Sequence, residues 1–203
     1  MEDSRQGISV RQSLVKVPRF IVGLIVYALG LVLIMKADFG RTPWDVFSHG
    51  VSIVSHITIG MADIAISLAL LVFALVKKRG VGLGTVLNTL LIGVFIDLFF
   101  ALLPGNVHIG VKAVYFALGL FFVALGNYIY ISTRMSPGVR DILVKYIMDT
   151  TGWSLRFVKS MVEILAAVCG ALLGGQWGPG TVIFACLIGL TTNRVFSLFH
   201  FKW

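Results

Sequence analysis

The stretch GLGTVLNTLLIGVFID (82–97) decides the fold, because GPGTVIFACLIGLTTN (178–193) repeats it 96 residues later without a gap. Both stretches open with Gly-x-Gly-Thr-Val, share Leu-Ile-Gly further on, and end with Asp97 aligned with Asn193. Each begins an apolar run of about 20 residues, the length of a helix that crosses a bilayer. The chain is therefore expected to be a duplicated helical membrane protein.

The same offset extends the repeat over almost the whole of each half. It aligns GLIVYALG (23–30) with GLFFVALG (119–126), and Asp45 with Asp141. Duplicated membrane halves often build a solute site between them. The repeat thus predicts an interface between halves where function would reside.

Composition points to the same class. The chain of 203 residues is 58% hydrophobic and 13% charged, whereas soluble domains carry about 25% charged residues. Unbroken apolar runs exclude the alternating segments of a membrane β-barrel. The formal charge of +8 gathers at helix ends, where it orients the chain and meets lipid head groups, so no nucleic-acid partner is expected.

Six membrane spans are predicted, in an all-α fold of two three-span repeats that form one membrane domain. The spans are 19–37, 58–77, 82–104, 109–132, 154–174 and 178–199. Residues 1–18 form a polar segment, 19–104 the first repeat, and 109–203 the second. With the N-terminus in the cytoplasm, only Lys36, Arg41 and Lys112 of the 17 Lys and Arg residues fall outside, which satisfies the positive-inside rule.

Three spans in each half make the repeat inverted, because an odd number of crossings reverses the entry side of the second half. Both termini are then cytoplasmic. Two segments between spans, 43–56 and 137–150, start with helix signals but are too short to cross. They are predicted to be re-entrant or interfacial helices, and the sequence leaves these alternatives open.

Polar residues near these segments are candidates for a solute path. Arg41, Trp44 and Asp45 follow the first span, and Arg140 and Asp141 are their counterparts in the second half. The alternative reading is structural, because an acidic first turn suits a helix dipole and a tryptophan anchors at the interface.

Ionised groups are costly in hydrocarbon and usually face a bundle interior, a partner or water. The intramembrane candidates for the path are Asp63, Asn88, Asp97, Glu163 and Asn193. The structural alternative for Glu163 is an ion pair with Lys159 one turn away. For Asp63 and Asp97 it is exposure at a span end.

A third group of residues is expected to serve hinges or close packing, because small residues let helices approach and Pro starts them. They are Gly40, Pro43, Gly82, Gly84, Pro137, Gly178 and Gly180. We find no motif for a metal, a cofactor or a nucleophile–base pair. We therefore expect a protein that is not an enzyme and carries no metal or cofactor.

The stretches LGLVLIMKADFGRTPWDV (29–46) and GLGTVLNTLLIGVFID (82–97) resemble the YczE/YitT-like family of bacterial integral membrane proteins. The resemblance implies a multi-pass protein of the bacterial plasma membrane with five or six spans, and it brings no settled activity. The second half departs from the motif at Arg140, which stands where Trp44 does.

The sequence favours a small secondary transporter or permease for an unidentified small solute or ion. The alternative is a non-transporting membrane scaffold that supports an export or biosynthetic assembly. Besides the lipid bilayer, a second copy of the chain is a possible partner, since glycine-rich faces suit helix pairing.

Overall fold

The computed structural model describes residues 10–105 and 107–199, and within them the secondary structure is entirely helical. Two helices, α2 and α6, have 13 residues each, and the other six have 18 to 28. In chain order the helices are α1 (Val10–Ala37), α2 (Pro43–Ser55), α3 (Ile59–Val76), α4 (Leu83–Leu102), α5 (Ile109–Ile131), α6 (Val139–Thr151), α7 (Leu155–Leu172) and α8 (Pro179–Leu198).

Five of the described helices are long and apolar enough to cross a membrane, which confirms the helical membrane class. They are α1 over Lys16–Ala37, α3, α4, α5 and α8. The remaining long helix, α7, carries Arg156, Lys159 and Glu163 within its 18 residues. The sixth span therefore stays a prediction.

The first helix begins earlier than hydropathy predicted. Helix α1 starts at Val10 and includes Pro18, whereas the expected first span started at 19. Backbone hydrogen bonds do not require apolar side chains, so a helix can extend beyond the apolar stretch that hydropathy detects. The rest of the expected N-terminal segment, residues 1–9, lies outside the described residues.

Helix bounds repeat at the sequence offset. Adding 96 to the bounds of α2, α3 and α4 gives the bounds of α6, α7 and α8. Each half thus consists of one long helix, one short helix and two further long helices. The helices keep the register that the ungapped sequence repeat predicts.

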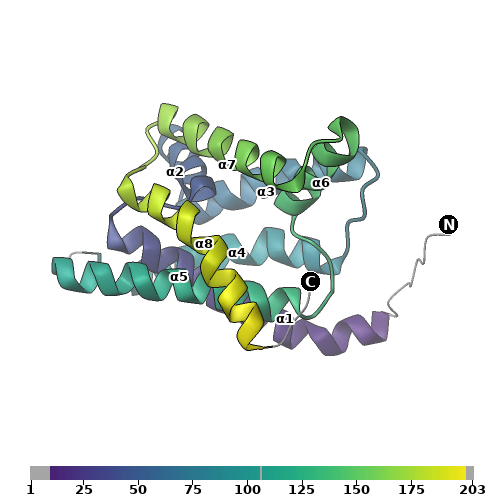
Figure 1. The fold of residues 1–203 in the computed structure, drawn as a ribbon, viewed down its shortest axis with the longest axis horizontal. Coiled ribbons are helices and arrows are strands. Elements are labelled where there is room, and N and C mark those ends of the chain that lie inside the picture. The colour runs from purple at the N-terminus through teal and green to yellow at the C-terminus, as the bar shows by residue number, and fades with distance from the viewer. Residues whose placement is uncertain (1–9, 106, 200–203) are drawn as a thin grey trace.

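The helices form two groups, which Figure 1 shows one above the other. The upper group holds α2, α3, α6 and α7, each of which contacts two others of the group. In the lower group, α1 contacts α4 and α5, and α5 also contacts α8. Helices α3 and α4 pack together and join the groups. Each group contains helices from both halves of the chain.

Helices α1 and α5 pack closely and run antiparallel. A Cβ on Gly23 would lie 2.6 Å from the backbone N of Tyr130, and one on Gly30 would lie 2.6 Å from that of Val123. At the other end, Gly119 lies against Ile34. Because a β-carbon has no room at these points, glycine is what permits this approach.

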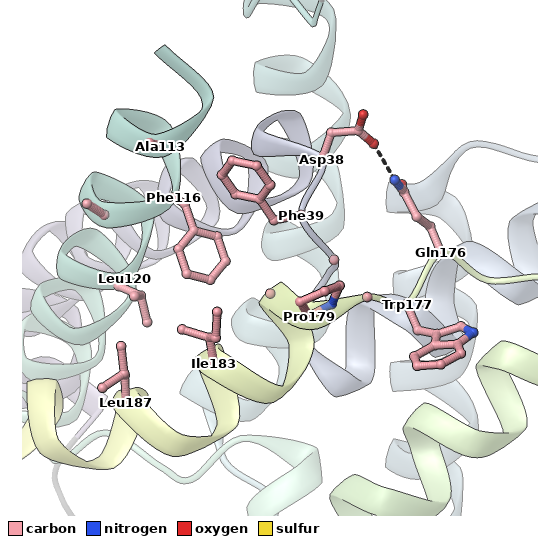
Figure 2. Close-up of a pocket in the computed structure, with 14 residues that line it drawn as sticks. Asp38, Phe39, Ala113, Phe116, Leu120, Gln176, Trp177, Pro179, Ile183 and Leu187 are labelled. Atoms are coloured by element: carbon pink, nitrogen blue, oxygen red, sulfur yellow. Dashed lines mark hydrogen bonds between the residues drawn. The ribbon is translucent and has the colours of Figure 1, made fainter. Parts of the chain in front are cut away.

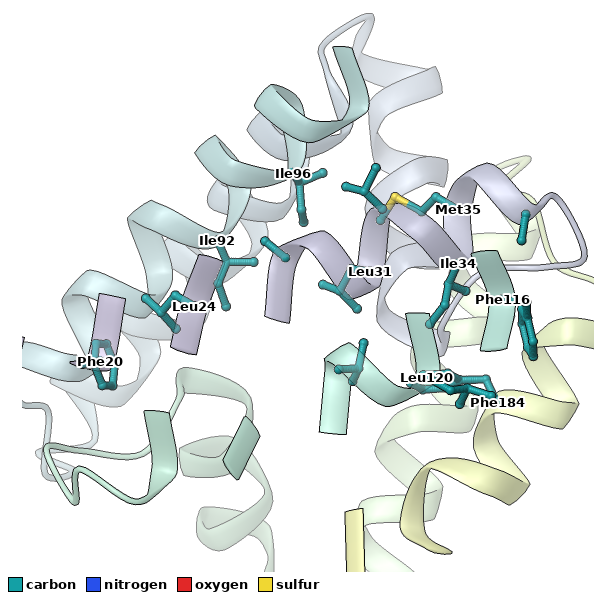
Figure 3. Packing of buried hydrophobic residues seen from close by; sticks show 14 residues of the cluster. Phe20, Leu24, Leu31, Ile34, Met35, Ile92, Ile96, Phe116, Leu120 and Phe184 are labelled. Atoms are coloured by element: carbon teal, nitrogen blue, oxygen red, sulfur yellow. The ribbon is translucent and has the colours of Figure 1, made fainter. Parts of the chain in front are cut away.

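The largest apolar cluster surrounds α1, as Figure 3 shows. In α1, 61% of the membrane-spanning stretch is buried inside the protein, against 22–33% in the other four spans. Leu24, Leu31 and Ile34 of α1 pack with residues of α4, α5 and α8, among them Ile92, Ile96, Phe116, Leu120 and Phe184. Helix α1 is therefore the most buried span; α4 and α5 pack directly on it, α3 packs on α4, and α8 packs on α5.

Candidate functional site: a buried charge cluster where the two halves meet

The short helix α2 is fixed at its start by local sequence. Gly40 has φ of 128°, a conformation that a residue with a β-carbon rarely adopts. Thr42 caps the helix by accepting a hydrogen bond from the Asp45 backbone N at 3.3 Å, and Pro43 is the first helical residue. This start places Asp45 in the first turn with its side chain buried.

Helix α2 buries a stripe of polar side chains. Asp45, Ser48 and Ser52 recur at helical spacing and are 1%, 0% and 7% exposed. The sequence analysis nominated Asp45 but missed Ser48. The signal that could have found Ser48 was this polar periodicity within an otherwise apolar helix.

An ion pair links the two halves within the upper group of helices. Arg140 at the start of α6 pairs with Asp63 of α3, through Nη2 and Oδ1. The hydroxyl of Ser48 donates to the same Asp63 oxygen at 3.1 Å. The side chains of Asp63 and Arg140 are 4% and 23% exposed, so this is a largely buried, hydrogen-bonded charge pair.

Trp44 and Arg140, which the repeat aligns with each other, are in contact. The guanidinium carbon of Arg140 lies 4.7 Å from the centroid of the Trp44 ring, a cation–π geometry. In an arrangement with two-fold pseudo-symmetry, a residue meets its own counterpart only at the axis. The departure from the motif at Arg140 thus gives unlike partners where two tryptophans would otherwise meet.

The Asp45 carboxylate is buried without a partner. Among the described residues, neither of its oxygens receives a hydrogen bond, and both are shielded from solvent. Burial raises the pKa of the Asp45 carboxyl to about 6; the negative charge of Asp63 acts in the same direction, and the neighbouring Thr42 hydroxyl and the positive charges of Arg140 and Arg41 act against it. A buried carboxylate of this kind can take up a proton, a cation or a hydrogen-bond donor.

Arg41 belongs to a second network beside the cluster. Its Nε donates to Gln176 Oε1 at 3.1 Å, while its Nη1 is buried and has no partner in the described part of the chain. Gln176 in turn donates to Asp38, which pairs with Lys112 at 2.9 Å. Sequence reasoning missed Asp38 and Gln176, because their significance depends on loops 135 or more residues apart in sequence meeting in space.

The two Gly-x-Gly-Thr starts each dock on a loop of the opposite half. At α4, the Thr85 backbone N donates to Ser136 Oγ and its hydroxyl to Pro137 O, both at 2.8 Å. At α8, the Gly180 backbone N donates to Phe39 O at 2.7 Å. These starts tie the helices of one half to the loops of the other.

The residues predicted to serve hinges or packing all lie in or beside these contacts. Gly40 lies against Thr181 and Gly178, and Gly84 lies against Ser136. The set comprises Gly40, Pro43, Gly82, Gly84, Pro137, Gly178 and Gly180. Their positions are those of close helix–loop contacts, and a hinge role for them stays a prediction.

The other predicted path residues do not join the charge cluster through hydrogen bonds. Asp97 accepts from Thr58 Oγ1 at 2.5 Å and from Gly60 N at 2.8 Å, so it ties the start of α3 to α4. Asn88 lies beside Gly138. Asp141 and Asn193 are exposed, and Glu163 is half-buried on α7.

Within the described residues, no group of three or more His, Cys, Asp or Glu side chains is arranged to hold a metal ion. The polar groups available to a ligand are instead mixed in charge: Arg41 and Arg140 against Asp45 and Asp63. Such a cluster offers binding to a small ion or polar solute and exchange of a proton at the unpartnered carboxylate.

The fold and the cluster define a multi-pass helical membrane protein with buried charges between its two halves. The chain belongs to the family of unknown function DUF6198, whose pattern matches residues 14–196. This finding confirms the YczE-like family that the sequence resembles.

Proteins similar to this chain come from bacteria. The chain is 32% identical over 173 residues to the uncharacterized membrane protein YczE of Bacillus subtilis strain 168, covering 84% of this chain and 80% of the relative. It is 31% identical to an uncharacterized protein of Haemophilus influenzae, over 83% and 79% of the two chains. The uncharacterized protein YyaS of B. subtilis is 27% identical, over 83% and 86%. No solved structure matches the chain.

Proposed function

We propose that the protein is a small secondary transporter or permease whose solute site is the buried charge cluster. The observation that carries the proposal is the Asp45 carboxylate, 1% exposed and without a partner, beside an Asp63–Arg140 pair that joins the two halves. A purely structural interior gains nothing from an unpartnered buried charge. Transporters of duplicated architecture place their sites at such an interface.

The helix contacts support an inverted repeat. The contact of Gly23 with Tyr130 corresponds, under the sequence offset, to that of Gly119 with Ile34. The equivalent helices α1 and α5 run antiparallel, as two copies threaded in opposite senses must. The pseudo-two-fold axis then passes near residues 28 and 124, in the middle part of both spans.

The same axis supports re-entrant positions for α2 and α6. Trp44 and Arg140 are counterparts in contact, so they lie at the axis and at the depth of the middle of α1. Helix starts at that depth direct backbone N–H groups and a positive dipole end toward the site. Irregular backbone at this depth is tolerated where it is buried in protein or lines a cavity.

We propose that α7 is the sixth crossing. It corresponds to the span α3 by helix bounds, and it packs against α2 and α6. Its charged residues Arg156 and Lys159 lie in the first two turns, where long side chains reach the interface. The inverted arrangement then puts both termini in the cytoplasm of a bacterial cell and the chain in its plasma membrane.

The charges of the cluster suggest how a solute could be coupled to a proton. With all four groups ionised, Arg41 and Arg140 balance Asp45 and Asp63. A proton or a small cation on Asp45 neutralises its negative charge. The Arg140 guanidinium then has one negative charge fewer near it. We therefore assign Asp45 as the residue that takes up the coupling cation or proton, and Asp63 and Arg140 as its positioning pair.

The test begins with purified protein and a thermal-shift screen against inorganic ions and small metabolites. Hits are then carried to proteoliposomes that contain a pH-sensitive dye, and flux is followed with and without a proton gradient. Asp45→Asn should abolish both the thermal shift and the flux. Asp149→Asn is the matched control, since Asp149 is a half-exposed carboxylate paired with Arg79 outside the cluster.

Full flux in Asp45→Asn would contradict the site. A screen without any hit, with wild-type vesicles that remain impermeable to every compound tested, would instead favour a scaffold role.

A further inference from the structure

We propose that a groove between α5 and α8 binds one phospholipid with a zwitterionic ammonium–phosphate head group, its acyl chain lying along the two helices. This inference does not depend on transport at the charge cluster. It rests on the shape of the groove, the distribution of polar groups along it and its place between two spans.

The groove has a volume of about 660 Å³, which falls in the range of ligand sites. Its floor and walls are apolar, and Figure 2 shows Phe116, Leu120, Ile183 and Leu187 directed toward it. Both α5 and α8 are apolar enough to span the membrane. A groove between them therefore faces hydrocarbon rather than water.

One end of the groove is polar and the other is not. Asp38 and Gln176 lie at one end in Figure 2, while Leu187 lies at the opposite end. Lys112, next to the lining residue Ala113, pairs with Asp38 at 2.9 Å. This distribution matches an amphiphile with its head at the α1–α2 loop and its tail along α8.

The polar end offers charges of both signs. The ammonium of Lys112 is a partner for a phosphate, and the Asp38 side chain, 52% exposed, is a partner for an ammonium. A head group that carries both charges can exchange with this ion pair without leaving either protein charge alone. A purely anionic head group would face Asp38 and is disfavoured.

The opposite half of the molecule is filled where this groove is open. The residues equivalent to Phe116 and Leu120 are Phe20 and Leu24, which are 1% and 0% exposed. On α5 the groove is bordered by Ala113 and Ala117, whereas α1 carries the larger Val17 and Ile21 at the equivalent positions. The small side chains of α5 therefore leave a groove in the second half that the first half lacks.

Trp177 also marks this end as a membrane interface. It lines the groove and is 68% exposed, and tryptophan is enriched at the level of lipid head groups. The tryptophan places the polar end of the groove at the level of the lipid head groups, and the leucines place its other end among the acyl chains.

The experiment is native mass spectrometry of the full chain, purified in detergent and given equal amounts of phosphatidylethanolamine and phosphatidylglycerol. We expect one retained phosphatidylethanolamine per chain. Ala117→Phe should lower its occupancy about tenfold by filling the groove, equivalent to about 1.4 kcal/mol. Ala101→Phe, on an exposed face of α4, is the control and should leave occupancy unchanged.

Asp38→Asn tests the head-group assignment separately. It should remove the preference for phosphatidylethanolamine while leaving lipid binding detectable. Retention of no lipid, equal retention of both lipids by the unaltered chain, or a doubled protein mass in place of a lipid adduct would each overturn the proposal.

Discussion

At the scale of single residues, Asp45 is where the buried charge cluster destabilises the folded protein most directly. Its carboxylate is 1% exposed and unpartnered within the described structure, and burial raises its pKa to about 6. The folded protein therefore binds a proton more tightly than the unfolded chain between about pH 4 and 6. The contribution of Asp45 to stability is therefore greatest below this window and falls as pH rises through it.

Replacement of Asp45 by Asn should accordingly stabilise the protein above pH 6. The gain has an upper bound of about 3 kcal/mol, since each pKa unit corresponds to about 1.4 kcal/mol. The variant should also lose the part of the pH dependence between about pH 4 and 6 that Asp45 contributes. Unfolding in micelles at a series of pH values measures both effects, and an Asn variant less stable than wild type at pH 8 would contradict this account.

In contrast to Asp45, Arg140 is expected to stabilise the folded protein, so that its loss lowers the free energy of unfolding. Arg140→Ala leaves the carboxylate of Asp63 buried without its cation, at a cost of about 3–5 kcal/mol. Arg140→Lys keeps the charge but loses the planar stacking on Trp44, so it should fall between Ala and wild type.

Arg79→Ala serves as the control for Arg140, because the Arg79–Asp149 pair is considerably more exposed. Its effect on the free energy of unfolding should stay within about 1 kcal/mol. Equal effects of Arg79→Ala and Arg140→Ala on the urea midpoint would refute the distinction.

Sequence identified the charged members of the cluster but not their pairing. Trp44, Asp45, Asp63 and Arg140 are all nominated by polarity within apolar surroundings. That Asp63 meets Arg140 rather than a residue of its own half depends on how helices cross, which hydropathy does not encode. The role of Asp97 in the solute path stays a prediction, while its hydrogen bonds to Thr58 and Gly60 identify a structural task.

At the scale of helices, the close α1–α5 contact predicts which glycines cannot be replaced. A Cβ on Gly126 would lie 2.5 Å from the backbone N of Tyr27, whereas one on Gly189 of α8 meets nothing within 4 Å. Gly126→Leu should therefore separate α1 and α5 and cost about 1–3 kcal/mol. Gly189→Leu should have little effect.

Thermal unfolding of the two leucine variants checks this pair. A similar loss of stability in both would show that helix composition, not the α1–α5 contact, accounts for the result.

The sequence predicted most helices because apolar runs and helix starts are local signals. Helix α2 begins at the predicted Pro43, whose ring fixes the backbone there. Helix α6 begins at Val139, two residues after the predicted Pro137, with Gly138 as its N-cap. The status of α7 was less accessible. It carries three charged residues, Arg156, Lys159 and Glu163, and only its surroundings in the membrane decide whether such a helix crosses.

For the whole molecule, the path of α7 through the membrane is decided by labelling. Ser154→Cys and Trp177→Cys flank α7, and both positions are exposed. In a background with the native cysteines replaced, an impermeant maleimide applied outside intact cells should label position 177 and not 154. Labelling of both from one side would make α7 an interfacial helix and leave five crossings.

The contact between Trp44 and Arg140 has a consequence for how such a polypeptide could arise. Two separate, identical subunits would bring the same amino acid to the dyad from each side, and paired guanidinium groups would repel. Only after the two copies had diverged, as they have within this one chain, could one supply an indole and the other a cation. Each half has thereby become dependent on its sibling: expressed apart, the C-terminal fragment should assemble with the N-terminal fragment and not with itself.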